Sequence, residues 1–149
     1  MAELAWQDNL ITAEDDVRRI LQETRRIAVL GIKPESRSGQ PAYYVPDYLK
    51  SAGYDVVPVP TYYPDVDEIL GERVYRTVSE VPGDVDMVDV FRRPNDIPPH
   101  LDDIIAKAPK VVWFQLGIRN DAAAEELARS GIQVIQNRCT MADHRRFGL

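Results

Sequence analysis

The fold is decided by one stretch, Arg26-Ile-Ala-Val-Leu-Gly-Ile-Lys-Pro-Glu-Ser-Arg-Ser-Gly-Gln40. It opens with a continuous apolar run, Ile27 to Leu30, which is short enough to be a strand buried on both faces. Gly31 ends the run, and after a polar loop the apolar rhythm from Ala42 to Ala52 indicates a helix. Strand, glycine turn and helix form a corner that favours an anion, because free backbone N–H groups and the helix dipole meet there. The same pattern also fits a turn that binds nothing.

Strands and helices alternate along the rest of the chain. A leading helix is predicted at about 13–24, and further strands at 54–60, 85–91, 110–114 and 132–135. Helices are expected at 101–108, between Asn120 and Gly131, and from Thr140, with a short one from Ser79. This order predicts an α/β, Rossmann-like, doubly wound and mainly parallel five-stranded sheet with helices on both faces. We expect residues 1–149 to form a single domain.

Composition narrows the possible functions. The net charge of −6 argues against nucleic-acid binding, which relies on excess basic residues. No apolar run approaches the ~20 residues of a membrane span, and the amino end lacks a signal-peptide pattern. The cytoplasm is therefore the expected compartment. The single cysteine excludes an internal disulfide, and the scattered histidines and carboxylates lack metal-ligand spacing.

Five loops with candidate binding residues are predicted to meet at one edge of the sheet. They are the loop after Gly31, Pro60-Thr61, Arg92-Arg-Pro94, Gln115-Leu-Gly117 and Asn137-Arg-Cys139. In a parallel sheet, ligands bind beyond the carboxyl ends of the strands, near the switch in strand order. Local basic clusters also occur, at Lys33 with Arg37, at Arg92 with Arg93, at Arg119, and at Arg138 with Arg145 and Arg146. The edge therefore suits an anionic small molecule.

Two common nucleotide motifs are missing. NAD sites need G-x-G-x-x-G after the first strand and an acid near the end of the second, whereas here Ile32 and Lys33 follow Gly31 and the second strand ends in Pro58-Val-Pro-Thr61. A P-loop is also absent. A ligand with several phosphates and an apolar or amide-rich arm fits better.

The chain resembles a known family, the small stand-alone CoA-binding proteins. The Rossmann-like fold of that family is related to the CoA-binding domain of the succinyl-CoA synthetase α subunit. The resemblance runs from about Arg26 to Arg146. It rests on Ile27-Ala-Val-Leu-Gly31, Tyr54-Asp-Val-Val-Pro-Val-Pro60, Val88-Asp-Val-Phe-Arg-Arg-Pro94, Val111-Val-Trp-Phe-Gln-Leu-Gly-Ile118 and Asn137-Arg-Cys139.

The resemblance implies that coenzyme A or an acyl-CoA is bound, by a non-catalytic or accessory binding protein. The implied site residues are Gly31, Ile32, Lys33, Ser36, Arg37, Pro60, Thr61, Phe91, Arg92, Arg93, Pro94, Gln115, Leu116, Gly117, Asn137 and Cys139. The first loop would hold phosphates, the residues around Arg92 the adenine and ribose phosphate, and the later loops the pyrophosphate or pantetheine arm. Glu35 would oppose a phosphate, so it is expected to face solvent. A homodimer or an unknown protein partner is compatible with the sequence.

Other readings stay open. The protein could be a small thiol-dependent acyl-transfer or redox enzyme using Cys139, or a regulatory domain binding another nucleotide. A structural role is the more common one for a lone cysteine, because no general base is evident beside it. His100 is expected to face solvent at a helix start, and His144 is expected to be a surface residue. No catalytic residue is assigned.

Overall fold

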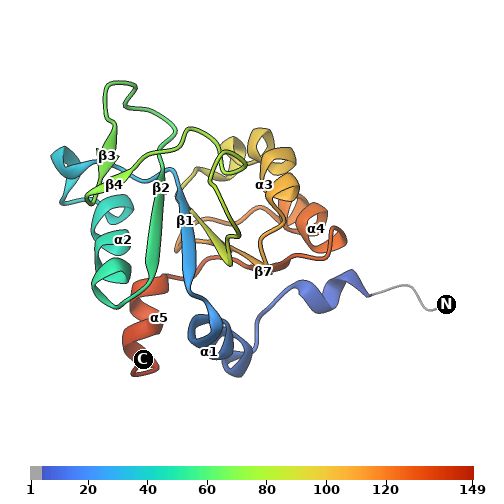
Figure 1. Ribbon diagram of the computed structural model, residues 1–149. Coiled ribbons are helices and arrows are strands. Elements are labelled where there is room, and N and C mark those ends of the chain that lie inside the picture. The colour runs from blue at the N-terminus through green and yellow to red at the C-terminus, as the bar shows by residue number, and fades with distance from the viewer. Residues whose placement is uncertain (1–4) are drawn as a thin grey trace.

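One parallel β-sheet of five strands forms the centre of the protein (Figure 1). The computed structural model describes residues 5–149. Every pair in the sheet is parallel. Neighbouring strands follow the order β2 (Asp55–Val59), β1 (Arg26–Leu30), β5 (Met87–Val90), β6 (Val111–Phe114) and β7 (Gln133–Ile135). The predicted Rossmann-like sheet is confirmed.

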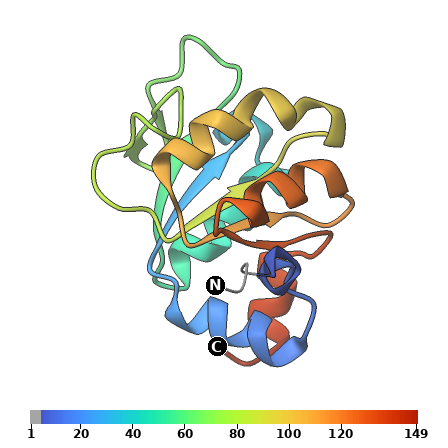
Figure 2. The same ribbon diagram turned by 90° about the vertical axis from the view of Figure 1, so that its right-hand side faces the viewer.

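Helices cover both faces of this sheet, as predicted. Figure 2 looks onto the face that α3 and α4 cover. The opposite face carries α1, α2 and α5, and α5 packs against both α1 and α2. The bounds of these helices are Glu14–Glu23 for α1, Pro41–Ser51 for α2, Leu101–Lys107 for α3, Asp121–Arg129 for α4 and Thr140–Arg146 for α5.

The strands are buried on both faces, because successive side chains enter two different apolar clusters. In β1, Ile27 and Val29 pack with the side chains of α1 and α2, whereas Ala28 and Leu30 pack with those of α3 and α4. All four side chains are at most 2% exposed. This two-sided burial explains why the sequence of β1 is continuously apolar rather than alternating.

The segment between β2 and β5 differs from its prediction. It contains a small antiparallel pair, β3 (Glu68–Ile69) and β4 (Glu72–Arg73), that the sequence did not predict. The helix expected from Ser79 is wrong, since the chain forms only a turn there. The carboxylate of Asp103 in α3 accepts the N–H groups of Val78 and Ser79 at 2.7 and 3.2 Å. The N–H groups of Val78 and Ser79 are therefore bonded to a side chain of α3 rather than to carbonyl groups of a helix.

Other segments of the chain lie along both edges of the sheet. At the β7 edge, Ile11 N–H donates to Val134 O at 2.9 Å, and the 3₁₀-helix η1 (Trp6–Asn9) packs against α4. At the β2 edge, Tyr75 N–H donates to Pro58 O at 3.0 Å. Both edge strands thus have backbone partners on their outer sides.

The switch in strand order lies at β1, which has β2 on one side and β5 on the other. Directly after β1, Gly31 adopts φ +87°, and its N–H donates to Val59 O at 2.9 Å. A Cβ on Gly31 would lie 2.3 Å from the carbonyl oxygen of Phe91. Only glycine fits this conformation and this close approach. Gly31 therefore lets the ends of β1 and β5 approach closely at the place where ligands bind in such sheets.

Gly31→Ala is expected to lower the free energy of unfolding by about 2–4 kcal/mol, because alanine is strained at positive φ and its methyl group would overlap the Phe91 carbonyl. Urea unfolding of the variant and the wild type measures the difference. Gly39→Ala is the matched control, since no described atom lies within 4 Å of its Cβ position, and it should change stability by less than about 0.5 kcal/mol. Equal losses in the two variants would contradict the steric explanation.

A buried polar group joins the centre of the sheet to α5. Asp89 of β5 has no exposed surface, and its carboxylate accepts a hydrogen bond from Gln115 Nε2 at 2.6 Å. The same amide donates to the Thr140 hydroxyl at 2.8 Å, and that hydroxyl lies 3.4 Å from the second oxygen of Asp89. Burial raises the pKa of Asp89 to about 7, although the hydrogen bonds from Gln115 and Thr140 act to lower it. The fold therefore favours the protonated carboxyl group.

Asp89 is expected to make stability fall as the pH rises. Its folded-state pKa of about 7 lies above the unfolded value of about 3.9, so the stability from this group is present at low pH and is lost between about pH 4 and about pH 7. Asp89→Asn cannot ionise, and it should gain stability relative to the wild type across that interval. Thermal unfolding between pH 4 and pH 8, with exposed Asp65→Asn as control, measures this difference. Parallel pH profiles for Asp89→Asn and the wild type would rule out the effect.

Candidate ligand-binding site

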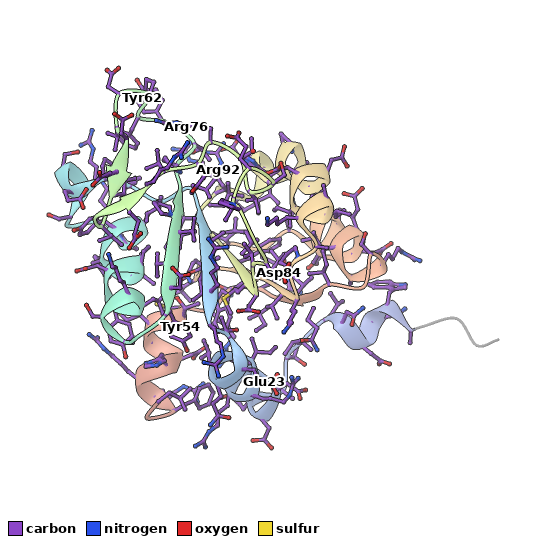
Figure 3. All side chains as sticks on the ribbon, viewed as in Figure 1. Glu23, Tyr54, Tyr62, Arg76, Asp84 and Arg92 are labelled. Carbon is purple, nitrogen blue, oxygen red and sulfur yellow. The ribbon has the colours of Figure 1, made fainter. Side chains whose placement is uncertain are left out.

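An open cavity of about 450 Å³ lies at the carboxyl edge of the sheet. Because β1 lies between β2 and β5, the segments that follow those two strands meet beside the switch point. Figure 3 shows Tyr62, Arg76 and Arg92 together at this end of the sheet, with Tyr54 at the opposite end. The lining consists of Pro60, Thr61, Tyr62, Pro64, Arg76, Arg92 and His100. Three predicted site residues, Pro60, Thr61 and Arg92, are thus in one cavity wall.

Arg92 is the central cation of the cavity. Its Nε donates to His100 Nε2 at 3.3 Å, and its Nη1 donates to the Thr61 hydroxyl at 3.2 Å. Its Nη2 lies 4.0 Å from Asp96 Oδ2. The Arg92 Cδ would be 3.3 Å from a Cβ on Gly31, so the arginine side chain passes directly beside the end of β1. Gly31 and Arg92 therefore lie side by side.

His100 lies in the wall of the open cavity, so the expectation that it faces solvent is met only in part. It ends the 3₁₀-helix η4 (Pro98–His100) and is half-buried. Burial lowers the pKa of His100 and nearby Arg92 lowers it further, whereas Asp103 and Asp96 raise it. The neutral ring accepts from Arg92 at Nε2, which assigns its proton to Nδ1.

Arg76 holds the outer wall of the cavity in shape. Its guanidinium donates to the carbonyl oxygens of Tyr62, Tyr63, Pro64 and Val66, at distances from 2.7 to 3.3 Å. Tyr63 has φ +62°, and Tyr62 leaves 72% of its surface exposed. Sequence reasoning missed Arg76 and Tyr62, because carbonyl oxygens occur at every residue and give no signal. In the sequence, Arg76 is only a lone arginine in a turn-rich segment, which does not indicate a site.

The backbone of the loop after β1 provides donors at the same edge. Ile32 is a predicted site residue, but the whole residue is only 1% exposed and its side chain packs in the core. Within residues 5–149, no backbone carbonyl accepts the N–H groups of Ile32 and Gly39. Helix α2 begins at Pro41, and its amino end adds a partial positive charge. Gly39 is exposed, so the loop offers its N–H group together with the dipole of α2.

The side chains of this loop are not among the residues that line the cavity. Lys33 Nζ is hydrogen-bonded to Gln40 Oε1, whereas Ser36 and Arg37 are exposed in the 3₁₀-helix η2 (Glu35–Arg37). Glu35 is exposed, as expected, but its carboxylate accepts the N–H of Leu70 at 2.8 Å. That bond fastens Glu35 to the turn between β3 and β4.

The residues after β6 and β7 form a separate corner of the rim. Gly117 N–H donates to Asn137 Oδ1 at 2.7 Å, and Asn137 N–H donates to Ile118 O at 3.1 Å. Leu116 leaves 69% of its surface exposed. The side chain of Gln115 is directed inward to Asp89, so a ligand can meet only the Gln115 backbone. None of these residues lines the cavity beside Arg92.

The three predicted residues around Arg92 differ in their exposure. Phe91 is partly buried and packs against the apolar cluster on the α1 side. Arg93 is exposed. Pro94 begins the 3₁₀-helix η3 (Pro94–Asp96), and its carbonyl accepts Asn120 Nδ2 at 2.9 Å. Arg92 is therefore the residue of this group that enters the cavity lining.

Cys139 is half-buried immediately before α5. The expectation that His144 is a surface residue is wrong, since only 6% of it is exposed. Its Nδ1 lies 2.7 Å from the hydroxyl of Tyr48, and burial lowers its pKa. Within residues 5–149, no hydrogen bond joins His144 to Cys139.

In the basic cluster near the carboxyl end, Arg138 and Arg146 form ion pairs, whereas Arg145 lies over the ring of Tyr48. Arg138 Nε lies 2.6 Å from Asp143 Oδ2, and Arg146 Nη2 lies 3.1 Å from Asp143 Oδ1. Both arginines also pair with Glu14, which joins α5 to α1. These contacts leave less of their charge for a ligand than Arg92 retains.

A second cavity of about 460 Å³ lies at the opposite edge, beside Tyr54, and Arg25 is the one arginine in its lining. The cavity at the switch point has two arginines, so it suits an anion better. Among residues 5–149, no cluster of histidine, cysteine and carboxylate side chains is arranged to hold a metal ion. In the same residues, no helix has the length and apolar character needed to span a bilayer.

Similarities to known proteins extend over most of the chain. The family described as "CoA binding domain" matches residues 25–145. An uncharacterized protein of Bacillus subtilis (strain 168), YneT, is 32% identical over 129 residues, which are 87% of this chain and 92% of that protein.

Solved structures share the fold. Cell-free ID.343 from Thermus thermophilus is 36% identical with a TM-score of 0.83, over 91% of this chain and 98% of that one. A hypothetical protein from Pyrococcus horikoshii OT3 is 33% identical with a TM-score of 0.82, over 98% of both chains. The dinucleotide-forming acetyl-coenzyme A synthetase 1 of Ca. Korarchaeum cryptofilum has a TM-score of 0.65 over 80% of this chain and 27% of that one, and at 22% identity this likeness concerns the fold. Because its match spans residues 25–145, the chain belongs to the CoA binding domain family.

Proposed function

We propose that this protein binds coenzyme A or an acyl-CoA at the carboxyl edge of its sheet, and that it is an accessory binding protein rather than a catalyst. One observation carries the proposal. In a chain of the CoA binding domain family, an arginine-lined cavity lies at the switch point, where the Arg92 side chain passes directly beside Gly31. In parallel sheets this is where ligands with phosphate groups bind.

In this proposal, the phosphates of the ligand are shared between Arg92 and the loop after β1. Arg92 faces the cavity and takes the ribose phosphate, because a guanidinium can form two parallel hydrogen bonds to one phosphate. The N–H group of the exposed Gly39 and the amino end of α2 receive the pyrophosphate. Lys33 and Arg37 supply counter-charge from the same loop.

The pantetheine arm is proposed to run along the second corner of the rim. Leu116 offers exposed apolar surface there, and Gly117 and Asn137 are fixed to each other by a hydrogen bond. Cys139 lies just beyond Asn137 in the chain. An amide-rich, apolar arm suits such a mixture of backbone and apolar groups.

A binding role, rather than thiol chemistry, is favoured by the contacts of the residues near Cys139. Its candidate base, His144, is hydrogen-bonded at Nδ1 to Tyr48 on another helix, and within residues 5–149 no hydrogen bond joins His144 to Cys139. The acetyl-coenzyme A synthetase of similar fold matches this chain over only 27% of its own length, so most of that enzyme has no counterpart among the matched residues. We therefore assign residues 1–149 a binding function and no catalytic residue.

Isothermal titration with CoA, dephospho-CoA and NAD tests the proposal. CoA is expected to bind best. Arg92→Ala should weaken CoA binding by about 1.5–3 kcal/mol, which is roughly tenfold to hundredfold in Kd, because a charged hydrogen bond to phosphate is lost.

Arg18→Ala is the matched control, because Arg18 is an exposed arginine of α1 outside the cavity. It should leave the Kd for CoA unchanged within about twofold. Tighter binding of NAD than of CoA by the folded wild type would overturn the proposal. An equal loss of CoA affinity in Arg18→Ala and Arg92→Ala would mean that Arg92 does not contact the ligand.

A further inference from the structure

Arg92 is contacted by residues of three different segments, yet these contacts do not use all of its guanidinium N–H groups. Its Nε–H is used by His100, its Nη1 contacts Thr61, and its Nη2 lies 4.0 Å from Asp96. A guanidinium has five N–H groups, one on Nε and two on each terminal nitrogen. Each terminal nitrogen therefore keeps an N–H group beyond these contacts. Two N–H groups, one on each terminal nitrogen (the fork), are the number that a bidentate contact with a phosphate requires.

His100 is the partner that uses only the Nε–H. Its own position is fixed by the short helix η4, where two prolines restrict the backbone and His100 N–H donates to Ile97 O at 2.9 Å. The ring is half-buried in the cavity wall. The charged groups that act on it are Arg92, Asp96 and Asp103, with Arg76 also in the cavity lining. Because the ring is neutral, it accepts from Arg92 without competing for the anion.

Asp96 is the alternative partner for Arg92. It follows four residues later in the chain, and its carboxylate is already at 4.0 Å. If the Nε contact with His100 were lost, the flexible arginine would be free to turn its fork to this carboxylate. A fork paired with Asp96 has fewer N–H groups for a ligand.

We propose that His100 is a positioning residue, which holds Arg92 by its Nε so that the terminal fork faces a phosphate monoester of the ligand. This inference rests on the proposed function, and it adds a specificity role for a residue that touches Arg92 rather than the ligand. It makes discrimination between CoA and dephospho-CoA depend on His100 acting through Arg92.

The first test requires no ligand. In the ¹H–¹⁵N spectrum of the arginine side chains, the Nε–H of Arg92 is expected to give a slowly exchanging signal in the wild type, assigned by its loss in Arg92→Lys. His100→Gln keeps a neutral acceptor and should retain the signal, whereas His100→Leu should lose it. A signal that survives in His100→Leu would overturn the contact on which the inference depends.

The second test measures selectivity. His100→Leu should weaken CoA binding about tenfold and leave the Kd for dephospho-CoA within about twofold, because only the phosphate monoester uses the fork. His100→Gln should restore most of the preference for CoA. In an Arg92→Ala background, His100→Leu should have no further effect, which is the non-additivity expected of residues that act as a pair.

The outcomes separate this inference from the proposed function. If CoA binds and Arg92→Ala weakens it, but His100→Leu weakens both ligands equally or acts additively with Arg92→Ala, the positioning role is wrong and the proposed function stands. If the folded wild type binds no CoA while the Nε signal depends on His100, the proposed function falls and so does the claim of phosphate selectivity. Thermal unfolding of each variant identifies one that has lost its fold, and His100→Gln then decides the test.

Discussion

The candidate site depends on the close approach of two backbones at the end of β1. The carbonyl of Phe91 occupies the space that a side chain on Gly31 would need, so β1 and β5 end side by side with no side chain between them. Strand pairing then fixes the point at which Arg92 leaves the sheet. The loops inherit their positions from this pairing, since a rigid sheet positions the binding residues that follow its strands.

Charge is distributed unevenly over the molecule. The chain carries a net charge of −6, yet it has arginines at the one edge where an anion is expected. Their roles differ, because Arg76 is bound to backbone carbonyls and Arg138 to carboxylates, whereas Arg92 keeps N–H groups that face the cavity. A local cluster of donors can hold a polyanion in an acidic protein, since short contacts at a partly buried site are screened less than the surface charge. The overall negative charge then acts mainly on the rate of encounter.

Most of the fold could be predicted from the sequence, because local patterns encode it. The apolar run of β1, the Asn120 side chain that caps α4 and the Gly131 that follows this helix are all local signals. The cavity wall could not be predicted in this way. Arg76 binds carbonyl oxygens that any residue supplies, and His100 meets Arg92 only through the path of the chain around two prolines. The assignment of ligand contacts to residues of the rim remains a prediction.

The covered edges of the sheet have a consequence for how this protein associates with itself. Open strand edges are templates for pairing with other chains, but here Ile11 and Tyr75 already bond to the outer strands β7 and β2. A second copy that paired with β7 at Val134 or with β2 at Pro58 would have to displace one of these segments. Tyr75 directly precedes Arg76, which shapes the cavity wall. The same short segment thus covers part of the β2 edge and holds the cavity wall, so a substitution within it would disturb both.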